Sequence, residues 1–332
     1  MKIVIVKLSA MGDIIHAMSA LQFIKKHIPD SRIDWIVEHS FVGILENNPY
    51  IDNILPVRLK SIKKNPLNII REIGRVRDYA NNNYDIVIDA QGLIKSAITS
   101  KLLGKGNIWG FSKESIRESE ASYFYDNYVD IAYHANTIDR NMKVLSQPLG
   151  FEISRRDVIN KEPILNYIPD DYINIYLKED MKNIIFIVGS TWESRNYPKE
   201  KFAKIADALK GNILVLWGTE KEKDIAEWIA YSSVYATAVP RLSFNDLKLL
   251  ISRADLLIGN DTGPTHIAWG LNIPSITIFG STPIERVYQT NINKVVKSKS
   301  VIDHYNLDKN DFSICDIDHN DIIKIANRLL DD

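Results

Sequence analysis

Apolar runs of strand length recur along the chain, and segments of helix length separate them. In the first half these runs are KIVIVKL, RIDWIVE, YDIVIDA and NIWGF, and in the second half they are NIIFIVG, NILVLWG, DLLIGND and SITIFG. Continuous apolar runs of this length are typical of strands that are buried on both faces. Their alternation with helical segments predicts βα units, and therefore an α/β fold built on parallel sheets.

The helical segments of the second half carry apolar residues at helical spacing. In PKEKFAKIADALK, the side chains of Phe202, Ile205, Ala206 and Leu209 share one face, and SFNDLKLLISRA shows the same kind of pattern. The alternation breaks down around 151–180, where two prolines and many polar residues occur.

These patterns predict two domains. The first, over 1–155, and the second, over 181–332, are joined by a linker over 156–180, and the last helix is left free to pack back on the first domain. Open α/β sheets bind ligands at the loops that follow the carboxyl ends of their strands. Two such domains side by side bring both sets of loops to a central cleft, so the architecture predicts a site for two substrates.

Composition narrows the class of protein. The chain has 332 residues, 41 Lys and Arg against 42 Asp and Glu, and a formal net charge of −1, which argues against a general nucleic-acid binder. A single cysteine, Cys315, excludes an internal disulfide and suits a reducing compartment. The apolar run at the N-terminus is too short to span a membrane and is followed by no cleavage site. We therefore expect a cytoplasmic protein, and we also expect a monomer.

Two strand-to-helix turns carry candidate chemistry. In the first turn, KLSAMGDIIH, Gly12 lets the backbone pass close to a ligand and Asp13 is presented as a carboxylate, or else as the N-cap of a helix that runs through Ala20. We interpret His16, one turn further on, as structural. No predicted strand is followed by G-x-G-x-x-G, which disfavours an NAD enzyme.

The second turn, NDTGPTH, follows the strand DLLIG. It places Asp261, Thr262, Gly263 and His266 at or just inside a helix N-terminus, where backbone N–H groups attract phosphate. Asp261 is also the natural N-cap of this helix. The glycine turn FGSTP after the next strand adds a neighbouring loop at the same sheet edge.

Four ordered motifs resemble the bacterial lipopolysaccharide heptosyltransferases of glycosyltransferase family 9. They are KLSAMGDIIHAMSAL, DAQGLIKSA at 89–97, STWESRNYPKEKF at 190–202 and NDTGPTHIAWGLNIPSITIFGSTP, and in detail they are closest to the type I enzymes, which add the first heptose to the inner core. The resemblance implies a GT-B fold of two Rossmann-like domains, with ADP-heptose as a substrate and Kdo-lipid A as acceptor. It also implies inversion at the anomeric carbon, with no metal and no other cofactor.

The resemblance assigns roles to residues. Asp13 becomes the base that deprotonates the acceptor hydroxyl. Arg195 lies where type I enzymes commonly have a lysine, so the charge is kept while the geometry of the contact changes. Glu222 takes the position of the ribose-binding acid, and Leu242 takes the position that packs on adenine. The full set of predicted donor-binding residues is Ser190, Thr191, Arg195, Gly218, Glu222, Leu242, Asp261, Thr262, Gly263 and His266.

The segment 58–77 holds seven basic residues against one acid. A solvated surface would explain such a run, but the Kdo carboxylate, lipid A phosphates and an anionic membrane surface would use it as well. The predicted acceptor-binding residues are Ser9, Arg58, Lys60, Lys63, Lys64, Gln91, Arg117 and Arg140. We expect Leu67, Ile70, Ile73 and Val76 in the helix that follows to face the core rather than to anchor the protein in a membrane.

Other functions remain open. A glycosyltransferase of the same fold with another sugar nucleotide, or with the acceptor of the second heptose, carries similar motifs. A non-catalytic nucleotide-sugar binding protein of two α/β domains has no need of an aspartate at the acceptor site, and it leaves the basic segment unexplained. For the enzyme, we expect peripheral contact with the cytoplasmic face of the inner membrane.

Overall fold

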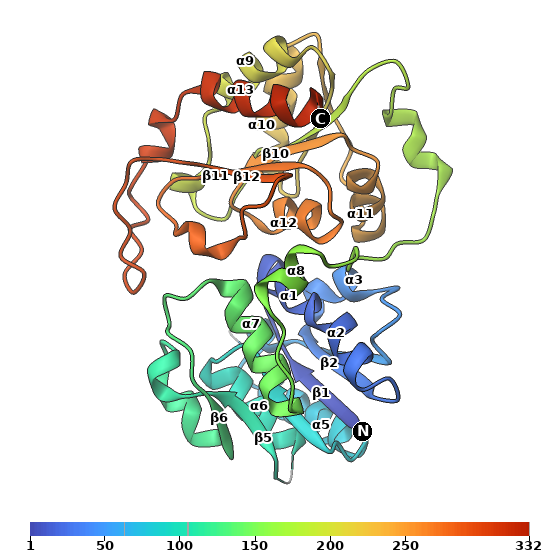
Figure 1. Ribbon diagram of the computed structural model, residues 1–332, viewed down its shortest axis with the longest axis vertical. Helices are drawn as coiled ribbons and strands as arrows, with labels where there is room; N and C mark the ends of the chain where they lie inside the picture. The colour runs from blue at the N-terminus through green and yellow to red at the C-terminus, as the bar shows by residue number, and fades with distance from the viewer. Residues whose placement is uncertain (63, 105, 332) are drawn as a thin grey trace. The chain divides into compact units, whose positions relative to one another are not determined.

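The chain forms two compact units, Met1–Asn166 and Tyr167–Asp332, in the computed structural model shown in Figure 1. The structure describes residues 1–62, 64–104 and 106–331. The division between the units falls inside 156–180, the segment predicted as a linker, which also contains most of a short helix, α8.

The first unit is built on a parallel sheet. Within its described residues the sheet has six strands in the order β3-β2-β1-β4-β5-β6, the strand order of dinucleotide-binding domains. The strands are β1 (Lys2–Val6), β2 (Arg32–Glu38), β3 (Asn53–Val57), β4 (Ile86–Asp89), β5 (Ile108–Phe111) and β6 (Asn127–Val129).

Helices flank this sheet. Helix α7 packs against both α1 and α2, and α5 packs beside α6. The helices are α1 (Met11–Met18), α2 (Ala20–His27), α3 (Val42–Leu45), α4 (Leu59–Ile62), α5 (Asn68–Ala80), α6 (Ile94–Leu103), α7 (Thr137–Ser146) and α8 (Arg155–Ile159).

The second unit repeats this plan. In the described residues its six parallel strands have the order β12-β11-β10-β7-β8-β9, which is the same order when counted from β7. The strands are β7 (Asn183–Ile187), β8 (Asn212–Leu216), β9 (Ala236–Ala238), β10 (Leu256–Asn260), β11 (Ser275–Phe279) and β12 (Asn293–Lys297). The helices are α9 (Lys199–Leu209), α10 (Glu220–Ser232), α11 (Phe244–Ser252), α12 (Gly263–Gly270) and α13 (His319–Asp331).

The last helix, α13, belongs to the second unit. It packs against α9 and runs beside β10, β11 and β12 (Figure 1). Its residues Ile322, Ala326 and Leu329 lie in the same buried cluster as Phe202 and Ile205 of α9.

The predicted α/β fold is confirmed, and each of the eight predicted strands is present. The sequence missed β3, β6, β9 and β12, which are the outermost strands of the two sheets. An edge strand is covered on fewer sides, so its apolar run is short or interrupted. In β3, for example, Asn53 and Pro56 interrupt the pattern, and proline is tolerated only at such an edge.

The first helix is shorter than predicted. It ends at Met18 instead of running through Ala20, and α2 starts at Ala20. The hydroxyl of Ser19 donates to the carbonyl of His16 at 2.6 Å, which ties the break to the end of α1. Of the helices in the described part of the chain, none combines the length and the apolar character needed to cross a bilayer.

Candidate active site

The carboxyl end of β1 leads into the loop that presents Asp13. Asp13 lies in the first turn of α1, is partly exposed, and accepts a hydrogen bond from the backbone N–H of Ala10 at 3.1 Å through Oδ2. The N-cap residue of α1 is Ala10, so Asp13 is not the N-cap considered from the sequence. Its carboxylate is held in place by a backbone bond and remains accessible to solvent.

Gln91 fixes the same loop from the neighbouring strand end. Its Oε1 accepts hydrogen bonds from the backbone N–H groups of Leu8 at 3.1 Å and Ser9 at 3.0 Å. The backbone N–H of Gln91 in turn donates to the buried carboxylate of Asp89 at 2.8 Å. The predicted acceptor residues Ser9 and Gln91 therefore lie together beside the Asp13 loop, and the Gln91 side chain is engaged with the backbone of that loop.

A buried lysine lies under this loop. Nζ of Lys7 donates to the carbonyl of Ala90 at 2.7 Å and to Oδ1 of Asn141 at 3.1 Å. Burial lowers the pKa of Lys7, while the carboxylates of Asp13 and Asp89 act in the opposite direction. Burial likewise raises the pKa of Asp89, against the hydrogen bonds that its carboxylate accepts. The strand ends of the first unit thus enclose a compact polar network.

Two predicted acceptor arginines differ in their surroundings. Arg117 is exposed. Arg140 donates to the carbonyls of Ser115 at 2.7 Å and Ala132 at 2.9 Å, and its guanidinium lies 4.8 Å from the centre of the Phe111 ring. Arg140 therefore ties two loops of the first unit together, a role that its sequence position did not reveal.

Three of the basic residues predicted to contact the acceptor lie around α4. Arg58, Lys60 and Lys64 are exposed, and Lys63 lies outside the described residues. Nη2 of Arg58 is 3.3 Å from Nε2 of His39, and Nζ of Lys60 lies 4.8 Å from the centre of the Phe41 ring.

In the second unit, a buried carboxylate organises the loops after β10, β11 and β7. Asp261 follows β10 directly, and its Oδ2 accepts from Nη2 of Arg195 at 2.6 Å and from the hydroxyl of Thr282 at 2.8 Å. Nε2 of His266 is 3.4 Å from Oδ1, and Nη1 of Arg286 is 3.7 Å from Oδ2. Burial would raise the pKa of Asp261, but the guanidinium groups of Arg195 and Arg286 and the hydrogen bond with His266 outweigh it and hold the pKa well below its usual range.

The prediction that Asp261 caps α12 is wrong. The N-cap residue is Thr262, which makes no side-chain capping bond, and the carboxylate of Asp261 is instead committed to Arg195 and its neighbours. Thr262 and Gly263 do lie at the start of α12, and His266 lies within its first turn, as predicted. The site combines a helix N-terminus with two guanidinium groups against one carboxylate, an arrangement that suits a phosphate group.

Serine hydroxyls complete this side of the site. Oγ of Ser190, after β7, and Oγ of Ser281, after β11, are buried and have no hydrogen-bond partner within the described residues. Buried hydroxyls normally have a partner, so both are available to a bound anion. Thr191, beside Ser190, is exposed. The sequence missed Ser281, Thr282 and Arg286, although the turn FGSTP marked their loop.

The loop after β8 carries the predicted ribose-binding acid. Oε2 of Glu222 accepts from the backbone N–H groups of Gly218 at 2.7 Å and Thr219 at 3.1 Å, which fixes the carboxylate at the start of α10. The same side chain lies directly over Gly189, where a Cβ atom would run into it. Leu242, in the loop after β9, is partly exposed and leaves an apolar surface accessible.

Comparisons with known proteins agree on one family. The profile of glycosyltransferase family 9 (heptosyltransferase) matches residues 75–311. Lipopolysaccharide heptosyltransferase 1 of Campylobacter coli is 39% identical over 100% of both chains. The protein of the same name from Pseudomonas aeruginosa is 29% identical over 85% of this chain and 79% of its own. The solved structure of E. coli heptosyltransferase WaaC with ADP-2-deoxy-2-fluoro heptose superimposes with a TM-score of 0.79 at 24% identity, covering 99% of each chain.

Proposed function

The chain belongs to glycosyltransferase family 9, the heptosyltransferases, and on this premise we propose that it transfers L-glycero-D-manno-heptose from ADP-heptose to the Kdo of Kdo-lipid A. The relatives that carry the name lipopolysaccharide heptosyltransferase 1 support heptose transfer in lipopolysaccharide synthesis. One observation carries the proposal: Arg195 and Arg286 gather around Asp261 at the start of α12. Together with the helix N-terminus they form an anion site that suits the diphosphate of the leaving ADP.

Asp13 acts as the base in this proposal. Its carboxylate takes the proton of the acceptor hydroxyl, and the freed oxygen attacks the anomeric carbon of the heptose. The bond from that carbon to the phosphate oxygen breaks, ADP leaves with the electron pair, and the configuration inverts. The backbone bond from Ala10 supports this role, because it fixes the carboxylate while leaving it partly exposed.

The second unit holds the donor. The N–H groups at the start of α12, the hydroxyls of Ser190 and Ser281, and the guanidinium groups of Arg195 and Arg286 stabilise the charge that develops on the pyrophosphate. Glu222 accepts a hydrogen bond from the ribose, and Leu242 packs on the adenine. In this scheme the protein supplies the stabilising charges itself, and no tightly held metal takes part.

The acceptor is a lipid, so the enzyme works in contact with the inner membrane. Arg58, Lys60 and Lys64 are exposed and suit the carboxylate of Kdo and the phosphates of lipid A. Arg117 adds a further exposed cation.

The direct test incubates the purified protein with ADP-heptose and Kdo-lipid A. We expect release of ADP and a gain of one heptose in the mass of the acceptor, with the same rate in the presence of EDTA. ADP release without a mass gain would indicate hydrolysis of the donor, and no reaction at all would refute the proposal.

A further inference from the structure

Three large apolar side chains at the start of α5 point to solvent. Leu67, Ile69 and Ile70 are 73%, 47% and 71% exposed, and together we call them the apolar tip of α5. The sequence predicted Leu67, Ile70, Ile73 and Val76 in the core. That prediction holds for Val76, whereas Ile73 is only partly buried and the prediction is wrong for Leu67 and Ile70.

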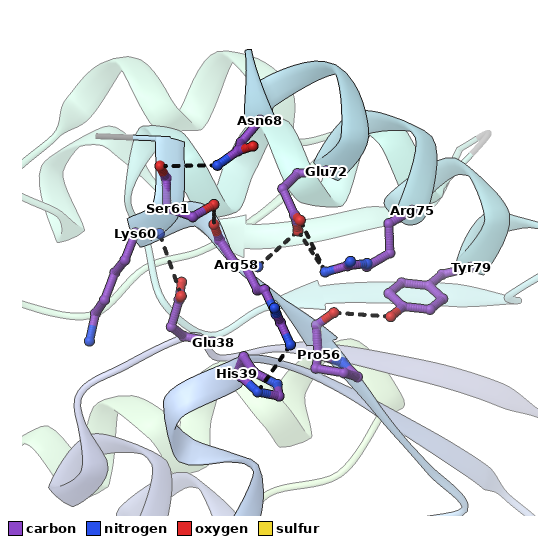
Figure 2. A network of polar contacts seen from close by, with 10 residues as sticks. All are labelled: Glu38, His39, Pro56, Arg58, Lys60, Ser61, Asn68, Glu72, Arg75 and Tyr79. Carbon is purple, nitrogen blue, oxygen red and sulfur yellow. Dashed lines mark hydrogen bonds and ion pairs between the residues drawn. The ribbon is translucent and has the colours of Figure 1, made fainter. Parts of the chain in front are cut away.

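The opposite face of α5 is anchored by other residues, which is why the tip cannot turn inward. Glu72 is buried and accepts from the backbone N–H of Arg58 at 2.8 Å, and the hydroxyl of Tyr79 donates to the carbonyl of Pro56 at 3.0 Å (Figure 2). Nδ2 of Asn68 donates to the carbonyl of Ser61 at 3.4 Å. These contacts fix the rotation of the helix, so Leu67 and Ile70 remain on the surface.

The exposed charges described in the segment 58–77 are all basic. The one acid of 58–77 is Glu72, and its carboxylate is buried and pairs with Arg75 at 3.0 Å. The remaining basic side chains described in this segment are all exposed, and they are Arg58, Lys60, Lys64, Arg71 and Arg77. The segment therefore combines exposed apolar side chains with basic residues that no acid of the same segment balances.

We propose that the apolar tip of α5 inserts into the surface of an anionic phospholipid bilayer while the surrounding basic residues bind its head groups. Apolar side chains flanked by Lys and Arg are the combination by which interfacial helices bind such membranes. The proposal deepens the proposed function, because a lipid-linked acceptor brings the enzyme to a bilayer, and it names the surface that makes the contact. Vesicles without acceptor test it independently of transfer.

The experiment measures binding of the full chain to vesicles of phosphatidylglycerol and phosphatidylethanolamine, with phosphatidylcholine vesicles for comparison. We expect the wild type to bind the anionic vesicles, and to bind them less at high salt. Leu67→Ser combined with Ile70→Ser should lower the partition coefficient by about 10- to 100-fold, because each exposed apolar side chain that enters the interface contributes about a factor of ten.

A matched control changes two apolar residues in the second unit that are even more exposed than Leu67 and Ile70. Tyr231 and Val234 are 91% and 94% exposed, and Tyr231→Ser combined with Val234→Ser should leave vesicle binding unchanged. Circular dichroism checks folding, and each single variant, Leu67→Ser and Ile70→Ser, should show an intermediate loss of vesicle binding.

Failure of the wild type to bind anionic vesicles would overturn the proposal. Equal binding by the two double variants would also overturn it. So would a Leu67→Ser and Ile70→Ser double variant that binds vesicles like the wild type but has lost self-association, because the tip would then contact a second copy of the protein. If heptose transfer fails while vesicle binding behaves as expected, only the proposed function falls.

Discussion

Asp261 shows how a single buried carboxylate can assemble a binding site. It engages residues from three loops, namely Arg195 after β7, His266 in α12, and Thr282 and Arg286 after β11. Removing one partner of such a buried group leaves the others uncompensated. In the proposed donor site, Asp261 would therefore position the groups that bind the phosphate and would not bind the phosphate itself.

Asp13 is the residue on which turnover should depend most. Asp13→Asn keeps the size of the side chain and an oxygen that can accept the Ala10 N–H, but it removes the basic carboxylate. We expect kcat to fall by about 10²- to 10⁴-fold, the usual contribution of a positioned base. Affinity for ADP, measured by calorimetry, should not change. A variant within about tenfold of the wild type would reduce Asp13 to a structural residue of α1.

Gln91 allows the positioning and acceptor-binding roles to be separated. Gln91→Leu leaves the N–H groups of Leu8 and Ser9 without their acceptor, whereas Gln91→Glu keeps an oxygen for both. If the side chain positions the Asp13 loop, the Leu variant should lose about tenfold or more in kcat, in line with the cost of unpaired buried donors. The Glu variant should retain most of the activity. A rise in acceptor KM in both variants, with kcat unchanged, would instead assign Gln91 to the acceptor.

We expect Lys161 to make the free energy of unfolding depend on pH. Its side chain is buried, and burial lowers its pKa to about 7, partly against the nearby Glu162. In the unfolded chain the amine keeps its proton to about pH 10.4. Between the folded pKa of about 7 and the unfolded pKa of about 10.4, the unfolded state binds more protons than the folded state. The contribution of Lys161 to the free energy of unfolding therefore rises with pH across this range. Below the folded pKa the amine is charged in both states, and Lys161 destabilises the fold most.

Replacing Lys161 with Met should remove this effect. The melting temperature should rise more at about pH 6.5 than at about pH 10, because only at the lower pH does the wild type bury a charged amine. Thermal unfolding of both proteins at the two pH values measures the difference, and the other titrating groups cancel in the comparison. An equal gain at both pH values would show that Lys161 does not change its protonation on folding.

At the scale of the elements, neighbouring strand ends build the donor site. Strands β10, β7 and β8 are adjacent in the sheet, so the loops that follow them meet at one edge. Asn260, the last residue of β10, ties this strand to the loop after β7, because Nδ2 donates to the carbonyl of Val188 at 2.8 Å and Oδ1 accepts from the N–H of Tyr197 at 3.0 Å. The sheet therefore fixes the positions of the loops that form this site.

Gly189→Ala tests the contact between Gly189, after β7, and the side chain of Glu222 in α10. The new Cβ would run into the side chain of Glu222 and force it away from the N–H groups of Gly218 and Thr219. We expect ADP to bind about tenfold more weakly, a change consistent with the usual cost of overpacking. In a Glu222→Ala background the same substitution should have no further effect. Additive losses in the double variant, measured by calorimetry, would contradict the contact.

At the scale of the whole molecule, the interior was the predictable part. Strands covered on both faces, such as β1 and β10, have continuous apolar sequences, and the motifs at their ends located Asp13 and the start of α12. Arg195 and His266 were predicted in the same site as Asp261. The edge strands and the other partners of Asp261, Thr282 and Arg286, were not predicted, because they depend on which loops meet in the folded sheet. The apolar tip of α5 was misjudged because helical periodicity shows that residues share a face, but not whether that face is covered.

The central claim is that the enzyme adds the first heptose to Kdo, and an acceptor comparison tests it most directly. The rate of transfer from ADP-heptose is measured side by side on Kdo-lipid A and on the same acceptor that already carries one heptose. We predict rapid transfer to Kdo-lipid A, with one heptose added, and little transfer to the heptosylated acceptor. A preference for the heptosylated acceptor, or transfer to neither, would contradict the claim.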